Sequence, residues 1–467
     1  MLMNLRRMAL PVILLLLISL SLSACSSNPV EKDDKQITEQ ESKKDEQGIQ
    51  SISTEDLKEK LNDDSWVIVD TRINDAYNGW KLEGVKRGGH IKGAVDFSAK
   101  WLDVEVDNKE SILSETINVK GIEPAKNIVL YDANGKDALK VAEYLKGKGY
   151  ENLYTYDVKE WAEDESLPME FYENYKLIVP ASIVKDIIDG KKPETFEDAT
   201  QIKIIEASWG EEDTSYANGH VPTSFHINTD WIEPPPAWML ADDATLTEFA
   251  LNNGFTKDDT VIVTGEAQMA AYRVATVLRY IGVKDVRVLN GGLGAWISAG
   301  YEVETESHKP TPVTDFGAKI PANPDLIDTQ EELKVSLAKT DEFTLVDNRT
   351  WEEHIGESSG YSYHDKKGRI PGSVFGYAGK TDANSLDYYR NIDNTMRNAD
   401  EIIAMWKEYG IDTNKHLSFM CGSGWRAAEV LYYAQVMGLE NTSLYSDGWI
   451  GWSNNPENPV ETGEPTN

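Results

Sequence analysis

The sequence repeats one pattern three times, and this repetition constrains the fold more than any other feature. Each copy opens with an apolar strand that ends in an acid, and continues through a turn and a second apolar strand. A loop, an amphipathic helix ending in glycine, and a short strand followed by tryptophan complete it. The three opening strands read VIVDTR (67–72), IIEAS (204–208) and LVDNR (345–349). Apolar runs alternating with helical patterns are typical of parallel βαβ units, so we predict an α/β fold with repeats at 51–176, 177–321 and 322–467.

The N-terminus is typical of a secretory signal. Arg6 and Arg7 precede an apolar run, and small residues lead to Cys25. The ending Leu-Ser-Ala-Cys resembles a bacterial lipobox, in which the cysteine is lipidated and becomes the mature N-terminus. We therefore expect residues 1–24 to be a signal peptide and Cys25 a membrane anchor. An ordinary signal peptide or a spanning anchor is the alternative.

The composition restricts the kinds of partner that the protein can bind. Residues 25–50 are polar and charged, and predict a flexible tether between the lipid anchor and an extracytoplasmic globular body. The net charge of −33 argues against a nucleic-acid partner, because binding to phosphates relies on lysine and arginine. If Cys25 is lipidated, Cys421 is a free thiol in an oxidising compartment.

The order of the motifs resembles that of the rhodanese domain, in all three repeats. The motifs that carry the resemblance are the acid-ended strand, the turns HIKGAV (90–95), HVPTS (220–224) and RIPGSV (369–374), and the strand–loop–helix containing MCGSGWRAAEV (420–430). The resemblance implies three tandem rhodanese-like domains, each with a central parallel five-stranded sheet flanked by helices. It also implies a sulfurtransferase.

The terminal glycines of the three amphipathic helices, Gly149, Gly282 and Gly438, give a common frame for the loops. Counting back from them, Cys421 aligns with Asp132 and Gly265. Arg426 aligns with Asp137 and Ala270. We therefore expect the first and second repeats to be inactive and the third to be catalytic.

The Cys421 loop has the composition of an anion-binding turn. Backbone amides before a helix converge on an anion, and the helix N-terminus favours a thiolate at this position. The predicted site is the nucleophile Cys421 with the loop Gly422, Ser423, Gly424, Trp425 and Arg426. The alternative is an inert buried thiol.

Further donor-binding residues are suggested by the resemblance. Arg349 matches an arginine that helps to bind the donor anion in two-domain relatives, although it could instead pair with Asp347 or Glu352. A second arginine of those relatives is replaced by Glu353. Arg369, His364 and Lys366 are candidate replacements; the alternative for each is a solvated loop. Trp425 and Trp449 either wall the pocket or fill the core, whereas Trp452 is expected in the core.

The reaction implied by the resemblance is two-step sulfur transfer through a Cys421 persulfide, from a small anionic donor to cyanide or a thiol. Arg426 favours thiosulfate as the donor, with 3-mercaptopyruvate as the alternative. No metal or organic cofactor is required, and the two cysteines and seven histidines form no zinc framework in the sequence. The rival hypotheses are a non-enzymatic sulfur-carrier lipoprotein and a cysteine-dependent phosphatase.

Overall fold

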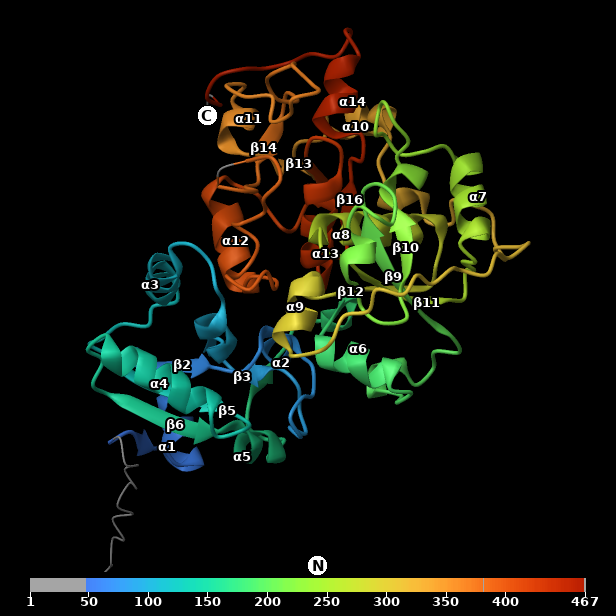
Figure 1. Ribbon diagram of the computed structural model, residues 1–467. Coiled ribbons are helices and arrows are strands. Elements are labelled where there is room, and N and C mark those ends of the chain that lie inside the picture. Colours follow the sequence, from blue (N-terminus) through green and yellow to red (C-terminus); the bar gives the residue numbers. More distant parts are fainter. Residues whose placement is uncertain (1–47, 381, 466–467) are drawn as a thin grey trace, which may run out of the picture. The chain divides into compact units, whose positions relative to one another are not determined.

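The computed structural model describes residues 48–380 and 382–465. The signal peptide, Cys25 and most of the predicted tether lie outside the described residues. Within the described part, no helix is long and apolar enough to cross a membrane. Each repeat forms its own parallel sheet, and the three sheets take up successive stretches of the chain (Figure 1).

The first repeat forms a five-stranded parallel sheet in the order β1-β6-β5-β2-β4. Its strands are β1 (Gln50–Ser51), β2 (Trp66–Asp70), β4 (Val95–Asp96), β5 (Asn127–Asp132) and β6 (Leu153–Asp157), and the pair β3 (His90–Ile91) and β7 (Met169–Glu170) lies apart. Its helices are α1 (Thr54–Lys60), α2 (Asn74–Asn78), α3 (Lys109–Val119), α4 (Asp137–Gly147), α5 (Val158–Glu163) and the 3-10 helix Ala99–Asp103. Apolar clusters fill both faces of the sheet.

The second repeat has the same strand order, β10-β9-β11-β12-β8. Its strands are β8 (Ile178–Val179), β9 (Ile202–Ser208), β10 (Phe225–Asn228), β11 (Thr260–Thr264) and β12 (Asp285–Leu289). Its helices are α6 (Ala181–Ile188), α7 (Asp243–Asn252), α8 (Gln268–Ile281), α9 (Gly292–Ser298) and the 3-10 helices Tyr175–Leu177, Glu194–Phe196, Tyr216–Asn218 and Thr229–Trp231.

The third repeat departs from the expected five strands, because its described sheet has four, in the order β14-β13-β15-β16. A single parallel bridge between Ile327 and Leu444 occupies the place of the fifth strand. The strands are β13 (Phe343–Asp347), β14 (Ser373–Phe375), β15 (His416–Met420) and β16 (Thr442–Leu444). The helices are α10 (Gln330–Ser336), α11 (Trp351–His354), α12 (Ala399–Glu408), α13 (Trp425–Val436), α14 (Gly448–Asn454) and the 3-10 helix Pro324–Leu326.

The second and third repeats share an apolar core. Helices α8 and α13 pack against each other, with Tyr272 in edge contact with Tyr432 and Tyr433 at ring-centroid distances of 5.4 Å (Figure 1). Every residue of α13 is buried apart from the half-buried Trp425. The helix that follows the cysteine loop is therefore held by the second repeat as well as by its own sheet.

Candidate active site

The β-ladders confirm the alignment of the three loops. The acid of the first strand pairs with Tyr131 in the first repeat, with Thr264 in the second and with Met420 in the third. The next residues are therefore equivalent, and they are Asp132, Gly265 and Cys421. The thiol thus lies at the carboxyl end of a central parallel strand, where open α/β sheets bind their ligands.

In the first repeat the backbone N–H groups of the equivalent loop bind a carboxylate of the loop itself. Asp132 turns its carboxylate into the loop and accepts the backbone N–H groups of Gly135 at 3.1 Å and Ala138 at 3.0 Å. In the third repeat the equivalent N–H, that of Gly424, donates to Cys421 Sγ at 3.2 Å. The sulfur therefore takes the place of one carboxylate oxygen and accepts one of the loop N–H groups.

Two glycines are required for the shape of the cysteine loop. Gly424 has a φ of +100° and caps α13. A side chain on Gly422 would put its Cβ only 2.0 Å from Tyr361 Oη. Tyr361 therefore occupies the space of a side chain that would follow the cysteine.

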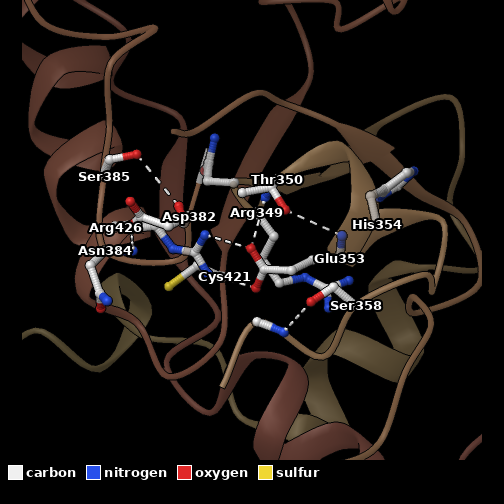
Figure 2. A network of polar contacts seen from close by, with 12 residues as sticks. Arg349, Thr350, Glu353, His354, Ser358, Asp382, Asn384, Ser385, Cys421 and Arg426 are labelled. Atoms are coloured by element: carbon white, nitrogen blue, oxygen red, sulfur yellow. Dashed lines mark hydrogen bonds and ion pairs between the residues drawn. The ribbon is translucent and has the colours of Figure 1, made fainter. Parts of the chain in front are cut away.

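Arg426 extends from α13 into a buried polar network. Its Nη1 donates to Glu353 Oε2 at 2.8 Å, and its Nη2 donates to Glu353 Oε1 at 3.0 Å and to Tyr361 Oη at 2.9 Å. Figure 2 shows the Glu353 carboxylate facing this guanidinium, with the Cys421 sulfur drawn beside it. Burial acts to raise the pKa of Glu353, but the adjacent Arg426 outweighs it and holds that pKa below its usual value. Arg426 is thus neutralised by a carboxylate.

The structure does not bring Arg349 to the thiol as a free cation. Its Nε and Nη2 donate to Asp347 at 2.8 and 2.7 Å, and Nη2 also donates to the carbonyl of Gly368 at 2.9 Å. His354 Nδ1 lies 2.8 Å from the same carboxylate, and burial, which would raise the pKa of Asp347, is outweighed by these two partners. The alternative of a pair with Asp347 is the one observed.

The thiol-free first repeat contains the same arrangement. Arg72 donates to both carboxylate oxygens of Asp70 and to the carbonyl of Gly89. An arrangement that recurs without a nucleophile has a structural role at the end of the strand, so we assign that role to Arg349 as well.

The remaining candidates stabilise the third repeat away from the sulfur. Arg369 pairs across an antiparallel bridge with Glu461 and donates to the carbonyl of Gly463 at 2.5 Å. His364 and Lys366 bind the side chain and carbonyl of Ser453 on α14. His364 and Arg369 are buried rather than part of a solvated loop, and a role of the three side chains in donor binding stays a prediction.

Trp449 contacts the cysteine loop, whereas Trp452 lies in the core. Trp449 is buried, lies 4.9 Å under the Arg349 guanidinium and donates its backbone N–H to the carbonyl of Cys421 at 2.8 Å. Trp452 belongs to the core, as predicted, because Trp161 and Trp296 make the same kind of indole-to-carbonyl bond in the other repeats.

The second repeat contributes directly to the cysteine loop, which the sequence did not reveal. Glu233 accepts the indole N–H of Trp425 at 2.7 Å and pairs with Arg273 of α8. Arg273 Nη2 donates to Ser446 Oγ at 2.7 Å, and Nη1 lies 3.0 Å from the position of a Cβ on Gly424. Among the described residues, this buried Nη1 has no hydrogen-bond partner.

Aromatic side chains cover the thiol, which is only 1% exposed. Tyr361 and Tyr363 come from the insertion between α11 and β14, and their rings lie 5.3 Å apart. Trp238 of the second repeat lies 5.2 Å from Tyr363. Burial raises the pKa of both tyrosines, so both phenols stay protonated at neutral pH.

A buried thiol that accepts a loop N–H at the carboxyl end of a parallel strand has the position expected of a cysteine that handles sulfur covalently. The family model of the rhodanese-like domain matches residues 53–164, 184–299 and 329–455. The chain belongs to the rhodanese-like family, and it is a sulfurtransferase of the rhodanese type.

The comparisons include enzymes of two named activities. The chain is 37% identical over 407 residues to the thiosulfate sulfurtransferase YnjE of Escherichia coli (strain K12), covering 87% of this chain and 91% of the relative. It is 25% identical over 276 residues to the thiosulfate sulfurtransferase of Bos taurus, covering 56% and 89%.

Among solved structures, the anaerobic ergothioneine biosynthesis enzyme from Chlorobium limicola, in complex with its natural substrate trimethyl histidine, has a TM-score of 0.84 and 36% identity over 90% of this chain and 100% of its own. The wild-type structure of EanB gives a TM-score of 0.83 at 36% identity, covering 89% of this chain and 98% of its own. A variant of EanB carries a cysteine persulfide and is bound to ergothioneine, at the same identity.

Proposed function

We propose that this protein takes a sulfane sulfur from thiosulfate onto Cys421 and passes it to a thiophilic acceptor. The observation that carries the proposal is the amide cradle, in which the Gly424 N–H donates to Sγ in the place where the first repeat holds a carboxylate. Such a cradle stabilises a thiolate before the reaction and a persulfide after it.

Both steps are balanced displacements. The Cys421 thiolate attacks the outer sulfur of thiosulfate, the S–S bond of thiosulfate breaks, and sulfite leaves with the electron pair. Cyanide or a thiolate then attacks the outer sulfur of the persulfide, and the Cys421 thiolate is released. In the first step the S–S bond of thiosulfate is replaced by that of the persulfide. In the second step the persulfide bond is replaced by an S–C bond with cyanide or an S–S bond with a thiol, so neither an external oxidant nor a reductant is consumed.

The charges around the loop also favour a second acceptor. Arg426, Arg349 and Arg273 are each paired with a buried carboxylate, so the site offers less positive charge than the sequence suggested. The aromatic side chains beside the loop are Tyr361, Tyr363 and Trp238, and the loop itself carries Trp425. Aromatic faces bind a quaternary ammonium through cation–π interactions. The second candidate is therefore sulfur transfer to the imidazole of trimethyl histidine, the substrate named for the Chlorobium limicola enzyme.

A single-turnover experiment tests both candidates. Protein loaded with thiosulfate and freed of excess donor is mixed in turn with cyanide, a small thiol and trimethyl histidine. Thiocyanate or hydrodisulfide formation supports the first candidate, and a thiolated imidazole supports the second. Sulfur that stays on Cys421 with every acceptor would instead favour a carrier protein, and rapid hydrolysis of p-nitrophenyl phosphate would favour a phosphatase.

The donor is tested by replacing thiosulfate with 3-mercaptopyruvate. We expect loading by thiosulfate to be faster. A reversed preference would assign the protein to the mercaptopyruvate-dependent class.

We also propose that the protein is an extracytoplasmic lipoprotein anchored through Cys25. The support is the sequence before it, with its positive start, apolar run and small residues. Cys25→Ala should release the protein from the membrane fraction, and a variant that stays bound would contradict the proposal.

A further inference from the structure

Three potential metal ligands converge in the second repeat, one of them far along the sequence from the other two. They are His220, Glu304 and His308, and their ligand atoms all lie within 4.8 Å of one another. The sequence did not predict this group, because 84 residues separate His220 from Glu304 and neither spacing matches a known zinc motif.

The backbone fixes two of the ligands. His220 and Glu304 form an isolated antiparallel bridge and exchange two backbone hydrogen bonds, both of 2.9 Å. Side chains directly opposite each other in such a pair lie on one face. His308, four residues after Glu304, is held by its backbone N–H, which donates to Tyr216 Oη at 3.1 Å.

His220 presents a nitrogen lone pair to the group. Its Nδ1 lies 2.8 Å from the carbonyl of Tyr216, so Nδ1 carries the proton and donates, which leaves Nε2 as the free acceptor. The side chain is fully buried, and its Nε2 has no hydrogen-bond partner among the described residues. A histidine whose second nitrogen is fixed by a carbonyl is the usual arrangement of a metal ligand.

The other two ligands meet without a hydrogen bond. His308 Nε2 lies 3.0 Å from Glu304 Oε2, yet within the described structure this nitrogen makes no hydrogen bond of acceptable geometry. Two ligands on one tetrahedral zinc ion are about 3.3 Å apart, given metal–ligand bonds of about 2.0–2.1 Å.

The acids equivalent to Glu304 in the other two repeats have different partners. The equivalent acid of the first repeat, Glu170, lies opposite His90 and pairs with Lys92 at 3.0 Å. In the third repeat, Glu461 pairs with Arg369. Each of these carboxylates thus forms an ion pair with a lysine or an arginine.

In the second repeat the position of Lys92 is taken by Pro222, and His308 is added instead. The carboxylate of Glu304 therefore lies beside imidazoles, and among the described residues no lysine or arginine forms an ion pair with it. A divalent ion between them would supply the positive charge that lysine and arginine supply in the other repeats.

We propose that His220, Glu304 and His308 bind a zinc ion in the second repeat, independently of Cys421. Two histidines and one carboxylate are a common zinc ligand set. Because Glu304 and His308 are 26% and 35% exposed, a water molecule can reach the fourth position. The metal would tie the segment after α9 to the turn that begins at His220.

Zinc titration tests this proposal. The protein, free of any affinity tag and carrying Cys25→Ser and Cys421→Ser so that thiols cannot contribute, is titrated calorimetrically, and the bound zinc is counted after dialysis. We expect one zinc ion per chain. His308→Gln and Glu304→Gln should each weaken binding about tenfold or more.

The matched control is Glu306→Gln, which removes the same charge from an exposed residue between the two ligands. It should bind zinc like the parent. Thermal unfolding without metal shows whether each variant is folded, and zinc should raise the midpoint of the parent and the control only.

Two results would overturn the proposal. Either the parent does not bind zinc, or His308→Gln, Glu304→Gln and the control bind it with equal affinity. In the first case Glu304 and His308 are only a side-chain pair within the segment after α9. Because the protein tested lacks both cysteines, its outcome does not depend on sulfur transfer.

Discussion

Alanine at position 422 should force Tyr361 off the cysteine loop. The new Cβ would lie 2.0 Å from Tyr361 Oη and 2.3 Å from two ring carbons, whereas ordinary contacts begin near 3.4 Å. The ring would have to move by about 1 Å or more, at a cost of about 1–3 kcal/mol for overpacking. It would also lose the bond from Arg426, worth about 1.5–3 kcal/mol for a charged donor.

The expected loss of stability is therefore about 3–6 kcal/mol. The corresponding fall in the thermal midpoint of the third repeat is at least about 6 °C. The assay is a double-mutant cycle between Gly422→Ala and Tyr361→Ala, read in the thermal midpoint and in the rate of persulfide formation. Once Tyr361 is truncated, Gly422→Ala should have almost no effect on stability.

A matched control comes from Gly294, in helix α9, where a Cβ would meet nothing within 4 Å. Gly294→Ala should leave stability unchanged or raise it by up to about 1 kcal/mol. If Gly422→Ala were harmless, or equally damaging with and without the Tyr361 ring, the assigned position of Tyr361 would be wrong.

Three further predictions follow from buried charges. Glu353→Gln should destabilise the protein by about 3–5 kcal/mol in calorimetry, because Arg426 keeps its charge without a partner; a midpoint equal to that of the parent would contradict this. Arg273→Met should slow persulfide formation more than Arg273→Lys, although Arg273 lies in the second repeat, and equal rates would show that its charge is not used. Burial raises the pKa of Glu206 to about 8, so the stability that its proton contributes is full below about pH 4.5 and is lost as the pH rises from there to about 8. Glu206→Gln should remove a pH dependence of a few kcal/mol over that range, and an unchanged stability–pH profile would refute it.

The fold was predictable because each repeat carries its own local pattern. The strand-ending acids, the loops and the helix-ending glycines fall where the repeats predicted, so Cys421 could be placed on its loop from the sequence. The fifth strand of the third sheet could not be foreseen, because one bridge at Ile327 replaces it and the repeat pattern does not distinguish a bridge from a short strand.

The charges of the site were less predictable. Arg349 was expected to bind the donor, although Arg72, in a repeat without a thiol, already suggested a structural pair. Glu353 looked like the loss of a cation, and the structure makes it the partner of Arg426. Which carboxylate neutralises which arginine depends on distances that sequence spacing does not give.

The contribution of the second repeat was the least predictable part. Glu233 and Arg273 contact the cysteine loop and the segment after β16, and both precede Cys421 by more than 140 residues. No periodicity or motif marks them, since only the packing of α8 against α13 brings them there. An unpaired buried guanidinium nitrogen is visible only in three dimensions.

The central claim is that Cys421 carries the transferred sulfur. The most direct measurement is intact-protein mass spectrometry after treatment with thiosulfate, on the parent and on Cys421→Ser. We predict that the parent gains the mass of one sulfur atom, that cyanide removes it as thiocyanate, and that the serine variant gains none. A sulfur that is still acquired by Cys421→Ser, or a parent that acquires none from any sulfane donor, would contradict the account.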